Sequence, residues 1–274
     1  MQIFFNASDI AALINKNPYK SQEEILHNIL CKIQKIENKT DINKFKNIDN
    51  TATLKLLDVF KNNKDITDTQ YEIYTDKLNT VKTTDDCLKL NKELLECVTK
   101  NCIKLNNTND CIKQQKILEK KVDNILGEKN TKEIKEYMNG FINKKRGIRN
   151  ENKIIEQYAK KYKTNVTNNN SKLYKYKLCS INDIDFYICG KIDGIENDEL
   201  IEVKNRKNRL FTFIPEYEQI QIEIYFKLTN LNKGKLIQNY NDTQSIILIE
   251  QNNDLWNIIE TELNIVANKL IDLL

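Results

Sequence analysis

The chain has 274 residues, of which 40% are hydrophobic and 30% charged, so it is long enough for one large domain or two small ones. A net charge of +4, from 43 Lys and Arg against 39 Asp and Glu, is too small to indicate a polyanionic partner by itself. No apolar run reaches about 18 residues and no signal-peptide pattern opens the chain, so we expect an intracellular protein without a membrane span.

The histidine and cysteine content excludes two common kinds of site. His27 is the only histidine and no Cys-x-x-Cys pair occurs, which excludes a histidine-dependent nucleophilic triad and disfavours structural zinc. Cys87, Cys97, Cys102 and Cys111 lie in one helical segment, where Cys97–Cys102 and Cys87–Cys111 pairs would join two antiparallel helices. Reduced thiols that pack as small hydrophobic side chains are the favoured alternative inside a cell.

The N-terminal half is predicted to be helical. Residues 6–9 (NASD) before IAALI predict an N-cap and a short helix, and residues 21–24 predict a capping box that opens a second helix. Residues 32–130 are polar, rich in Lys and Asn and helically patterned, and they contain no glycine before Gly127. We expect this stretch to be a helical insertion or arm.

The pattern changes after Gly140. Residues 147–163 predict an amphipathic helix in which Glu151 begins an apolar face. That carboxylate is either a first-turn residue favoured by the helix dipole or a functional side chain. Strands are predicted over residues 172–180, 183–193, 200–204, 235–240 and 244–251, followed by an amphipathic helix over residues 255–274. Helices, then strands, then a helix predict an α/β (α+β) fold.

The strongest chemical pattern is GKIDGIENDELIEVKNRKNR, residues 190–209. Because side chains alternate along a strand, Glu202 and Lys204 project from one side of LIEVK, and the turn after Asp193 brings a second carboxylate beside Glu202. Two close carboxylates raise each other's pKa unless a cation lies between them. Oxygen ligands without histidine or thiolate suit Mg²⁺ or Mn²⁺, and a nearby lysine can orient water or offset phosphate charge.

An ordinary surface hairpin with a Glu/Lys pair is the alternative, because this spacing also arises by chance in charged chains. The neighbouring residues favour function: the pattern runs directly into a basic segment, residues 204–209, and is followed by the glutamine pair Gln219 and Gln221. A second basic segment, residues 144–149, is equally compatible with solvated loops.

These motifs resemble those of the lambda-exonuclease family, or YqaJ-type viral recombinases, within the PD-(D/E)xK nuclease superfamily. KIDG and IEVK are similar to the PD-(D/E)xK motif through Asp193, Glu202 and Lys204, and GIRNEN is similar to the family's G-x-x-x-E-N helix start through Glu151. NASDIAALINKNPYKS resembles the family's first helix and turn, and EQIQIEIYF resembles its Q-(V/I)-Q helix. The resemblance spans roughly residues 1–30 and 133–274.

The resemblance implies a restriction-endonuclease-like core, in which a central mixed β-sheet is flanked by helices. This core would comprise residues 1–31 and 131–274, with residues 32–130 as a large helical insertion. QIQIEIYF alternates like a strand, whereas the family has a helix there. We prefer the helix, since Pro215 suits a first helical turn.

The resemblance also implies a metal-dependent deoxyribonuclease, a 5′→3′ exonuclease on double-stranded DNA in recombination, repair or viral DNA processing. Two Mg²⁺ or Mn²⁺ ions would occupy each active site, bridged by Asp193. The expected catalytic residues are Asp193, Glu202, Lys204, Glu151 and Gln219, the expected metal ligands are Asp193, Glu202, Glu151 and the Val203 carbonyl, and the expected DNA contacts are Ser8, Lys191, Arg206, Lys207, Arg209 and Gln221.

The chain departs from the family pattern at the motif aspartate and near the N-terminus. Ile192 stands where the family usually has proline, and Lys191 stands where it often has a small polar residue. No arginine precedes the N-terminal motif, although that arginine helps to hold a 5′-phosphate in relatives. We therefore expect Lys191, together with Ser8, to hold the phosphorylated end.

Two other functions fit the same residues. One is an endonuclease of the same superfamily, for restriction or repair, and the other is a non-catalytic DNA-binding or packaging protein on a nuclease fold. The resemblance implies double-stranded DNA, a single-strand annealing protein and further copies of the chain as partners, since relatives form trimers. A viral protein would lie in the host cytoplasm or nucleus, or be associated with the virion.

Overall fold

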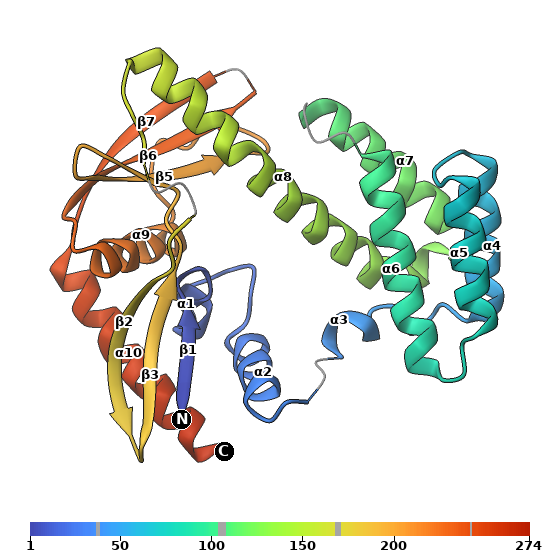
Figure 1. Ribbon diagram of the computed structural model, residues 1–274, viewed down its shortest axis with the longest axis horizontal. Coiled ribbons are helices and arrows are strands. Elements are labelled where there is room, and N and C mark those ends of the chain that lie inside the picture. The colour runs from blue at the N-terminus through green and yellow to red at the C-terminus, as the bar shows by residue number, and fades with distance from the viewer. Residues whose placement is uncertain (37–38, 104–107, 168–170, 242) are drawn as a thin grey trace. The chain divides into compact units, whose positions relative to one another are not determined.

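The computed structural model describes residues 1–36, 39–103, 108–167, 171–241 and 243–274, and the chain divides into two compact units (Figure 1). Unit 1 comprises Met1–Asn38 and Glu151–Leu274, and unit 2 comprises Lys39–Asn150. The predicted insertion, residues 32–130, differs from unit 2 at both ends. Unit 2 ends later than the predicted insertion because α8 (Lys132–Tyr162) is one continuous helix, and its first part belongs to unit 2. The sequence predicts instead a helix that begins at residue 147.

Unit 1 contains two mixed sheets. The first has the strand order β1-β3-β2, in which β1 pairs parallel and β2 antiparallel with β3. The second has the order β4-β5-β6-β7, in which β5 and β6 are parallel and the other pairs antiparallel. The predicted α/β class is confirmed, and the predicted strands are divided between two sheets. The strands are β1 (Gln2–Asn6), β2 (Tyr174–Ile181), β3 (Ile184–Gly190), β4 (Gly194–Glu196), β5 (Glu199–Asn205), β6 (Lys233–Tyr240) and β7 (Thr243–Glu250).

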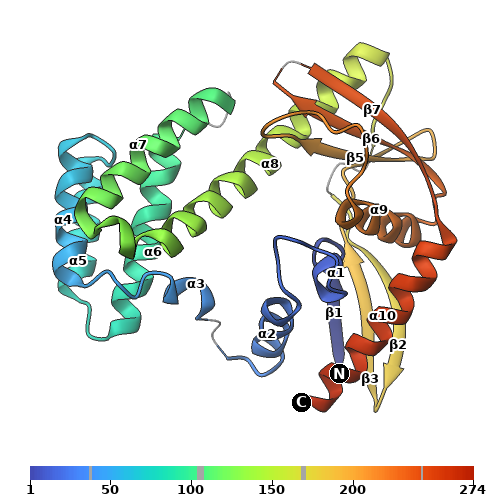
Figure 2. The same ribbon diagram turned by 180° about the vertical axis from the view of Figure 1, so that it is seen from behind.

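Four helices of unit 1 share the main hydrophobic core with these strands. They are α1 (Ala7–Leu13), α2 (Gln22–Ile33), α9 (Glu216–Thr229) and α10 (Asn253–Asp272). Helices α1, α9 and α10 contact one another and pack on the three-stranded sheet, as the reverse view in Figure 2 shows. The QIQIEIYF segment lies in α9, so the predicted helix is confirmed.

Strand β5 is buried on both faces. On one face Ile201 and Val203 pack with Ile237 of β6 and with Ile154 and Ile155 of α8. On the other face Leu200 and Leu236, which is the β6 partner of Glu202, join the core that contains α9. Because side chains alternate along a strand, Glu202 and Lys204 share the α9 face with Leu200. The predicted opposition between these charged residues and the apolar pair is confirmed.

Unit 2 is a helical bundle with its own core. Phe45, Phe60, Leu94, Val122 and Met138 are among the side chains buried there. Besides the first part of α8 it contains α3 (Thr40–Asn43), α4 (Asn50–Asn62), α5 (Asp68–Asn79), α6 (Thr84–Cys102), α7 (Thr108–Leu126) and η1 (Glu128–Asn130). All seven cysteines lie in the described part of the chain and carry thiols, so the disulfide alternative is wrong. No helix among the described residues is long and apolar enough to cross a membrane.

Candidate active site

The hairpin between β4 and β5 brings Asp193 to Glu202. Gly194 pairs with Ile201 in antiparallel register, and one further step along that register places Asp193 opposite Glu202. The Val203 N–H donates to Asp193 Oδ2 at 2.8 Å, which fixes the first carboxylate against β5. Asp193 is 8% exposed and Glu202 2% exposed, so both carboxylates are removed from bulk water.

Glu202 carries the strongest sign of an incomplete site. Its Oε1 lies 2.7 Å from the Lys204 Nζ, whereas its buried Oε2 has no hydrogen-bond partner among the described residues. Burial, and then the negative charge of Asp193, raises the pKa of Glu202 to about 8. A buried carboxylate oxygen without a partner is costly, so a cation at this position would relieve both effects.

Lys204 remains an ammonium in this setting. Burial lowers its pKa, but the carboxylates of Glu202 and Glu218 outweigh burial and raise the pKa above the ordinary value. The Lys204 side chain is 22% exposed, and its Nζ also donates to Gln221 Oε1 at 2.9 Å. Lys204 is therefore a fixed positive charge that solvent can still reach.

One face of α9 completes the surroundings of Lys204. Gln221 Nε2 donates to the Tyr225 hydroxyl at 2.8 Å, one helical turn further on. Gln219 points elsewhere: it is exposed, and its Nε2 donates to the Ile214 carbonyl at 2.6 Å. Two residues of a helix span about 200°, so only one of the two glutamines can face β5. Gln221, and not Gln219, therefore contacts Lys204, whereas the sequence assigns a catalytic role to Gln219 and a DNA contact to Gln221.

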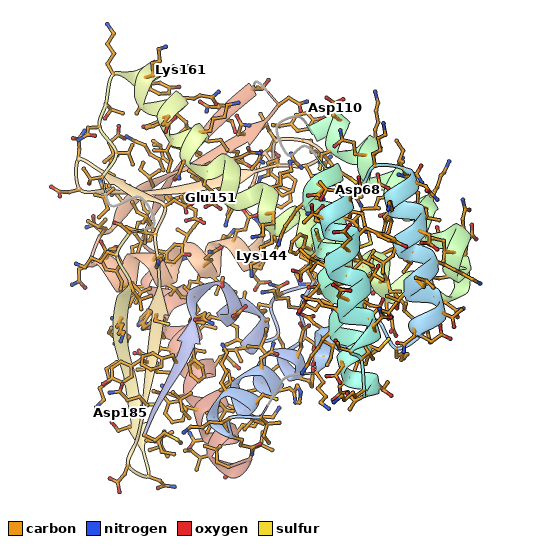
Figure 3. All side chains as sticks on the ribbon, turned by 45° about the vertical axis from the view of Figure 1, so that its right-hand side comes forward. Asp68, Asp110, Lys144, Glu151, Lys161 and Asp185 are labelled. Carbon is orange, nitrogen blue, oxygen red and sulfur yellow. The ribbon has the colours of Figure 1, made fainter. Side chains whose placement is uncertain are left out.

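Glu151 lies on α8 (Figure 3) and is half-buried. Burial raises the pKa of the Tyr225 hydroxyl, and the charges of Glu202, Asp193 and Glu151 raise it further. All three carboxylates are therefore within electrostatic reach of one hydroxyl. Among the described residues, no three Asp, Glu, His or Cys side chains are close enough to hold one metal ion together.

The donors present nevertheless fit a magnesium ion. Mg²⁺ keeps several waters and commonly takes one or two carboxylates from a protein, which Asp193 and Glu202 can supply. Within a strand, the N–H and C=O of one residue point to the same side, so the Val203 carbonyl faces the edge where Asp193 lies. The Oε2 atom of Glu202, which has no hydrogen-bond partner among the described residues, is the oxygen of that carboxylate that would be available to the ion.

The start of α1 and the end of β3 meet beside Asp193. Asn6 pairs with Cys189 in parallel register, so the chain leaves both strands at the same end of the three-stranded sheet. Ser8 and Lys191 follow there, and both are exposed. A Cβ at Gly190 would lie 2.9 Å from the Ala7 Cβ and 3.1 Å from the Tyr225 ring, so this close approach requires glycine.

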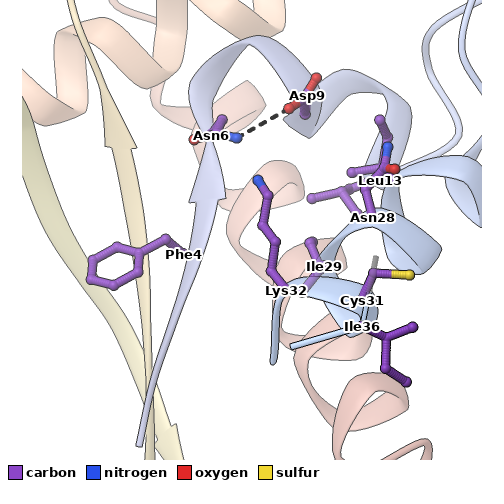
Figure 4. Close-up of a pocket in the computed structure, with 10 residues that line it drawn as sticks. Phe4, Asn6, Asp9, Leu13, Asn28, Ile29, Cys31, Lys32 and Ile36 are labelled. Carbon is purple, nitrogen blue, oxygen red and sulfur yellow. Dashed lines mark hydrogen bonds between the residues drawn. The ribbon is translucent and has the colours of Figure 1, made fainter. Parts of the chain in front are cut away.

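A pocket of about 270 Å³ lies between β1, α1 and α2 (Figure 4). Asp9 lines it and accepts a hydrogen bond from Asn6 Nδ2 at 3.2 Å. Lys20 Nζ forms an ion pair with the same carboxylate at 2.8 Å. Asp9 is thus neutralised by Lys20, and it stabilises the turn that presents Ser8.

The prediction that Arg206 contacts DNA is wrong. Arg206 is buried and forms a two-pronged ion pair with Glu218, at 2.5 and 2.8 Å, while its Nε donates to Gln238 at 2.6 Å. The guanidinium is therefore engaged within the protein. Lys207 is half-buried and Arg209 is exposed, so these two remain candidates for DNA contacts.

No protein-family model matches the chain, and no curated protein matches its sequence. Several solved structures are similar to it. An alkaline exonuclease from Laribacter hongkongensis is 16% identical over 60% of this chain and 80% of that one, with a TM-score of 0.38. Its complex with dAMP gives 20% identity over 47% of this chain and 68% of that one, with a TM-score of 0.37.

A phage-related exonuclease from Haemophilus somnus 129PT is also similar, with 12% identity, a TM-score of 0.38, and coverage of 48% of this chain and 71% of that one. These neighbours are exonucleases by name, and their TM-scores are all below 0.5.

Proposed function

We propose that the chain is a metal-dependent deoxyribonuclease that removes nucleotides from the ends of double-stranded DNA. The observation that carries this proposal is the buried set of Asp193, Glu202 and Lys204, in which one carboxylate oxygen has no partner among the described residues. A cation-binding carboxylate pair beside a fixed ammonium suits phosphodiester hydrolysis.

Each residue of the set has a separate task. Asp193, Glu202 and the Val203 carbonyl would hold Mg²⁺ or Mn²⁺, and Glu151 would contribute to a second ion. The bound ion would act as a Lewis acid and lower the pKa of the water that it binds. Lys204 would orient the attacking water and stabilise the negative charge that develops on the phosphate, while Gln221 holds the ammonium in position.

The DNA would be held through its backbone. Lys207 and Arg209 follow Lys204 directly and would contact phosphates without reading sequence. Removing either positive charge should reduce the salt slope of DNA binding by about one unit. Assembly into a homo-oligomer and interaction with a single-strand annealing protein stay predictions.

Digestion of a linear duplex labelled at each end in turn, with and without Mg²⁺, tests the proposed function. We expect cleavage only with Mg²⁺, release of nucleotides from the 5′ ends, and no attack on a covalently closed plasmid. Nicking of the plasmid would favour the endonuclease. Tight DNA binding without any cleavage would favour the packaging protein.

Variants of one hairpin sharpen this test. Asp193→Asn should abolish cleavage, whereas Asp198→Asn, in the exposed turn of the same hairpin, should leave it unchanged. Equal activity of the two variants would contradict the assignment of Asp193.

The preference for a phosphorylated end is tested separately. If Lys191 holds the terminal phosphate with Ser8, Lys191→Ala should reduce the rate ratio between 5′-phosphorylated and 5′-hydroxyl duplexes. An unchanged ratio would contradict this role.

A further inference from the structure

An exposed aromatic ring stands on the segment that joins the active-site strand to α9. Phe213 is 65% exposed and is the only phenylalanine among the exposed large hydrophobic side chains of the described residues. It lies on the connection between β5, which carries Glu202 and Lys204, and α9, which carries Gln221. The Phe213 ring therefore lies on the loop that joins two elements of the proposed site, β5 and α9.

The Phe213 ring packs against a second aromatic ring of the same loop. Phe213 stacks on Phe211, with ring centroids 6.2 Å apart and an interplanar angle of 11°. The Arg206 guanidinium lies 4.2 Å from the Phe211 ring centroid, and it also donates two hydrogen bonds to Glu218. A continuous stack therefore leads from a buried ion pair to an exposed ring face.

The backbone beneath the stack is held as well. Gln238 Oε1 accepts from the Phe211 N–H at 3.3 Å, and Gln238 Nε2 donates to the Phe211 carbonyl at 2.9 Å. The same amide oxygen also accepts a hydrogen bond from Arg206 Nε. The Gln238 side chain of β6 therefore holds both Phe211 and Arg206 in place. Little conformational entropy would be lost when a flat ligand covers Phe213.

Cations precede the ring in the local sequence. Residues 203–215 contain four Lys or Arg residues, of which Lys204 and Arg206 are paired with Glu202 and Glu218. Lys207 and Arg209 are the other two, and Glu216, which follows the ring, is paired with Lys16. Lys207 lies six residues and Arg209 four residues before Phe213, and Arg209 is exposed. A flat apolar face beside cations is complementary to a nucleobase joined to phosphates.

We propose that Phe213 is a stacking platform for an unpaired base at the end of the DNA strand held at this site. The adjacent phosphate is then bound by Arg209 and Lys207. The ligand class is single-stranded DNA of any sequence, because every base has a face that can stack. This inference rests on the proposed function for its placement at a DNA end, but binding can be measured without cleavage.

The test uses the full chain in EDTA, so that no divalent ion supports hydrolysis. The probes are a duplex with a short single-stranded overhang and a dumbbell duplex in which every end is closed. For the overhang duplex, Phe213→Ala and Phe213→Leu should each raise Kd about tenfold, whereas Phe213→Tyr should keep it. The dumbbell should bind all forms alike, and urea midpoints should be unchanged because the ring is exposed.

Photo-cross-linking identifies the contact directly. 5-Iodouracil in the overhang should cross-link to Phe213, and the yield should fall at least fivefold in Phe213→Leu. An overhang Kd and a cross-link pattern that are unchanged in Phe213→Leu would overturn the inference, and so would a chain that binds no DNA.

The two proposals can fail separately. Cleavage of duplex ends with Mg²⁺ and no effect of Phe213→Leu on binding would leave the nuclease and remove the platform. Phe213-dependent overhang binding without cleavage would leave the platform and remove the nuclease.

Discussion

Substitution of Glu202 by glutamine removes a proton-binding group whose pKa the fold has shifted strongly. The carboxyl pKa rises from its ordinary 4.5 to about 8 through burial and the charge of Asp193. Between these values the folded chain retains a proton that the unfolded chain has lost. The free energy of unfolding of the wild-type chain therefore falls as pH rises, by about 1.4 kcal/mol per unit from this group.

Glutamine has no proton to lose, so Glu202→Gln lacks this contribution. From about pH 5.5 to about pH 7.5, the free energy of unfolding of the variant should rise relative to wild type by about 3 kcal/mol. Urea unfolding in EDTA at several pH values measures the difference, and titrating groups that are distant from Glu202 cancel in it. Glu250→Gln, at an exposed carboxylate, is the control and should show no such trend. A difference between wild type and Glu202→Gln that does not change with pH would refute the reasoning.

Two further predictions follow from α9 and its partners. Gln221→Ala should lower the cleavage rate at least tenfold, because Lys204 loses its second partner, whereas Gln219→Ala should stay within about twofold. Steady-state rates on end-labelled duplex decide this, and equal effects would contradict it. Arg206→Met should cost about 3–5 kcal/mol in urea unfolding, because Glu218 is left buried and uncompensated. The double variant with Glu218→Leu should recover most of that loss, and a further loss would count against the buried pair.

Local pattern accounts for much of the predicted fold. The carboxylate hairpin was predictable because strand alternation and one turn place Asp193, Glu202 and Lys204 together within twelve residues of chain. In α9, by contrast, Ile220, Ile222 and Ile224 are all buried, since neighbours surround the helix on several sides. A helix buried on several sides carries no single apolar stripe, so its sequence can alternate like a strand.

Long-range partners account for the errors. The basic run after Lys204 predicts solvated or DNA-binding side chains, yet Arg206 pairs with Glu218 from another element. Nothing in the local composition indicates which of the three cations the fold buries. Tyr225 was also missed, because a tyrosine at the end of an apolar run predicts only packing. The Tyr225 ring lies close to Gly190, and this contact between distant parts of the chain cannot be read from the local sequence.

The central claim is that Asp193, Glu202 and Lys204 form a divalent-ion site for phosphodiester hydrolysis. The most direct measurement is the rate of Mg²⁺-dependent cleavage of linear duplex DNA by Lys204→Ala, compared with Lys233→Ala at an exposed lysine. We expect that Lys204→Ala has lost cleavage while its circular dichroism spectrum is that of the wild type, and that Lys233→Ala is fully active. Substantial cleavage by a folded Lys204→Ala chain would contradict it.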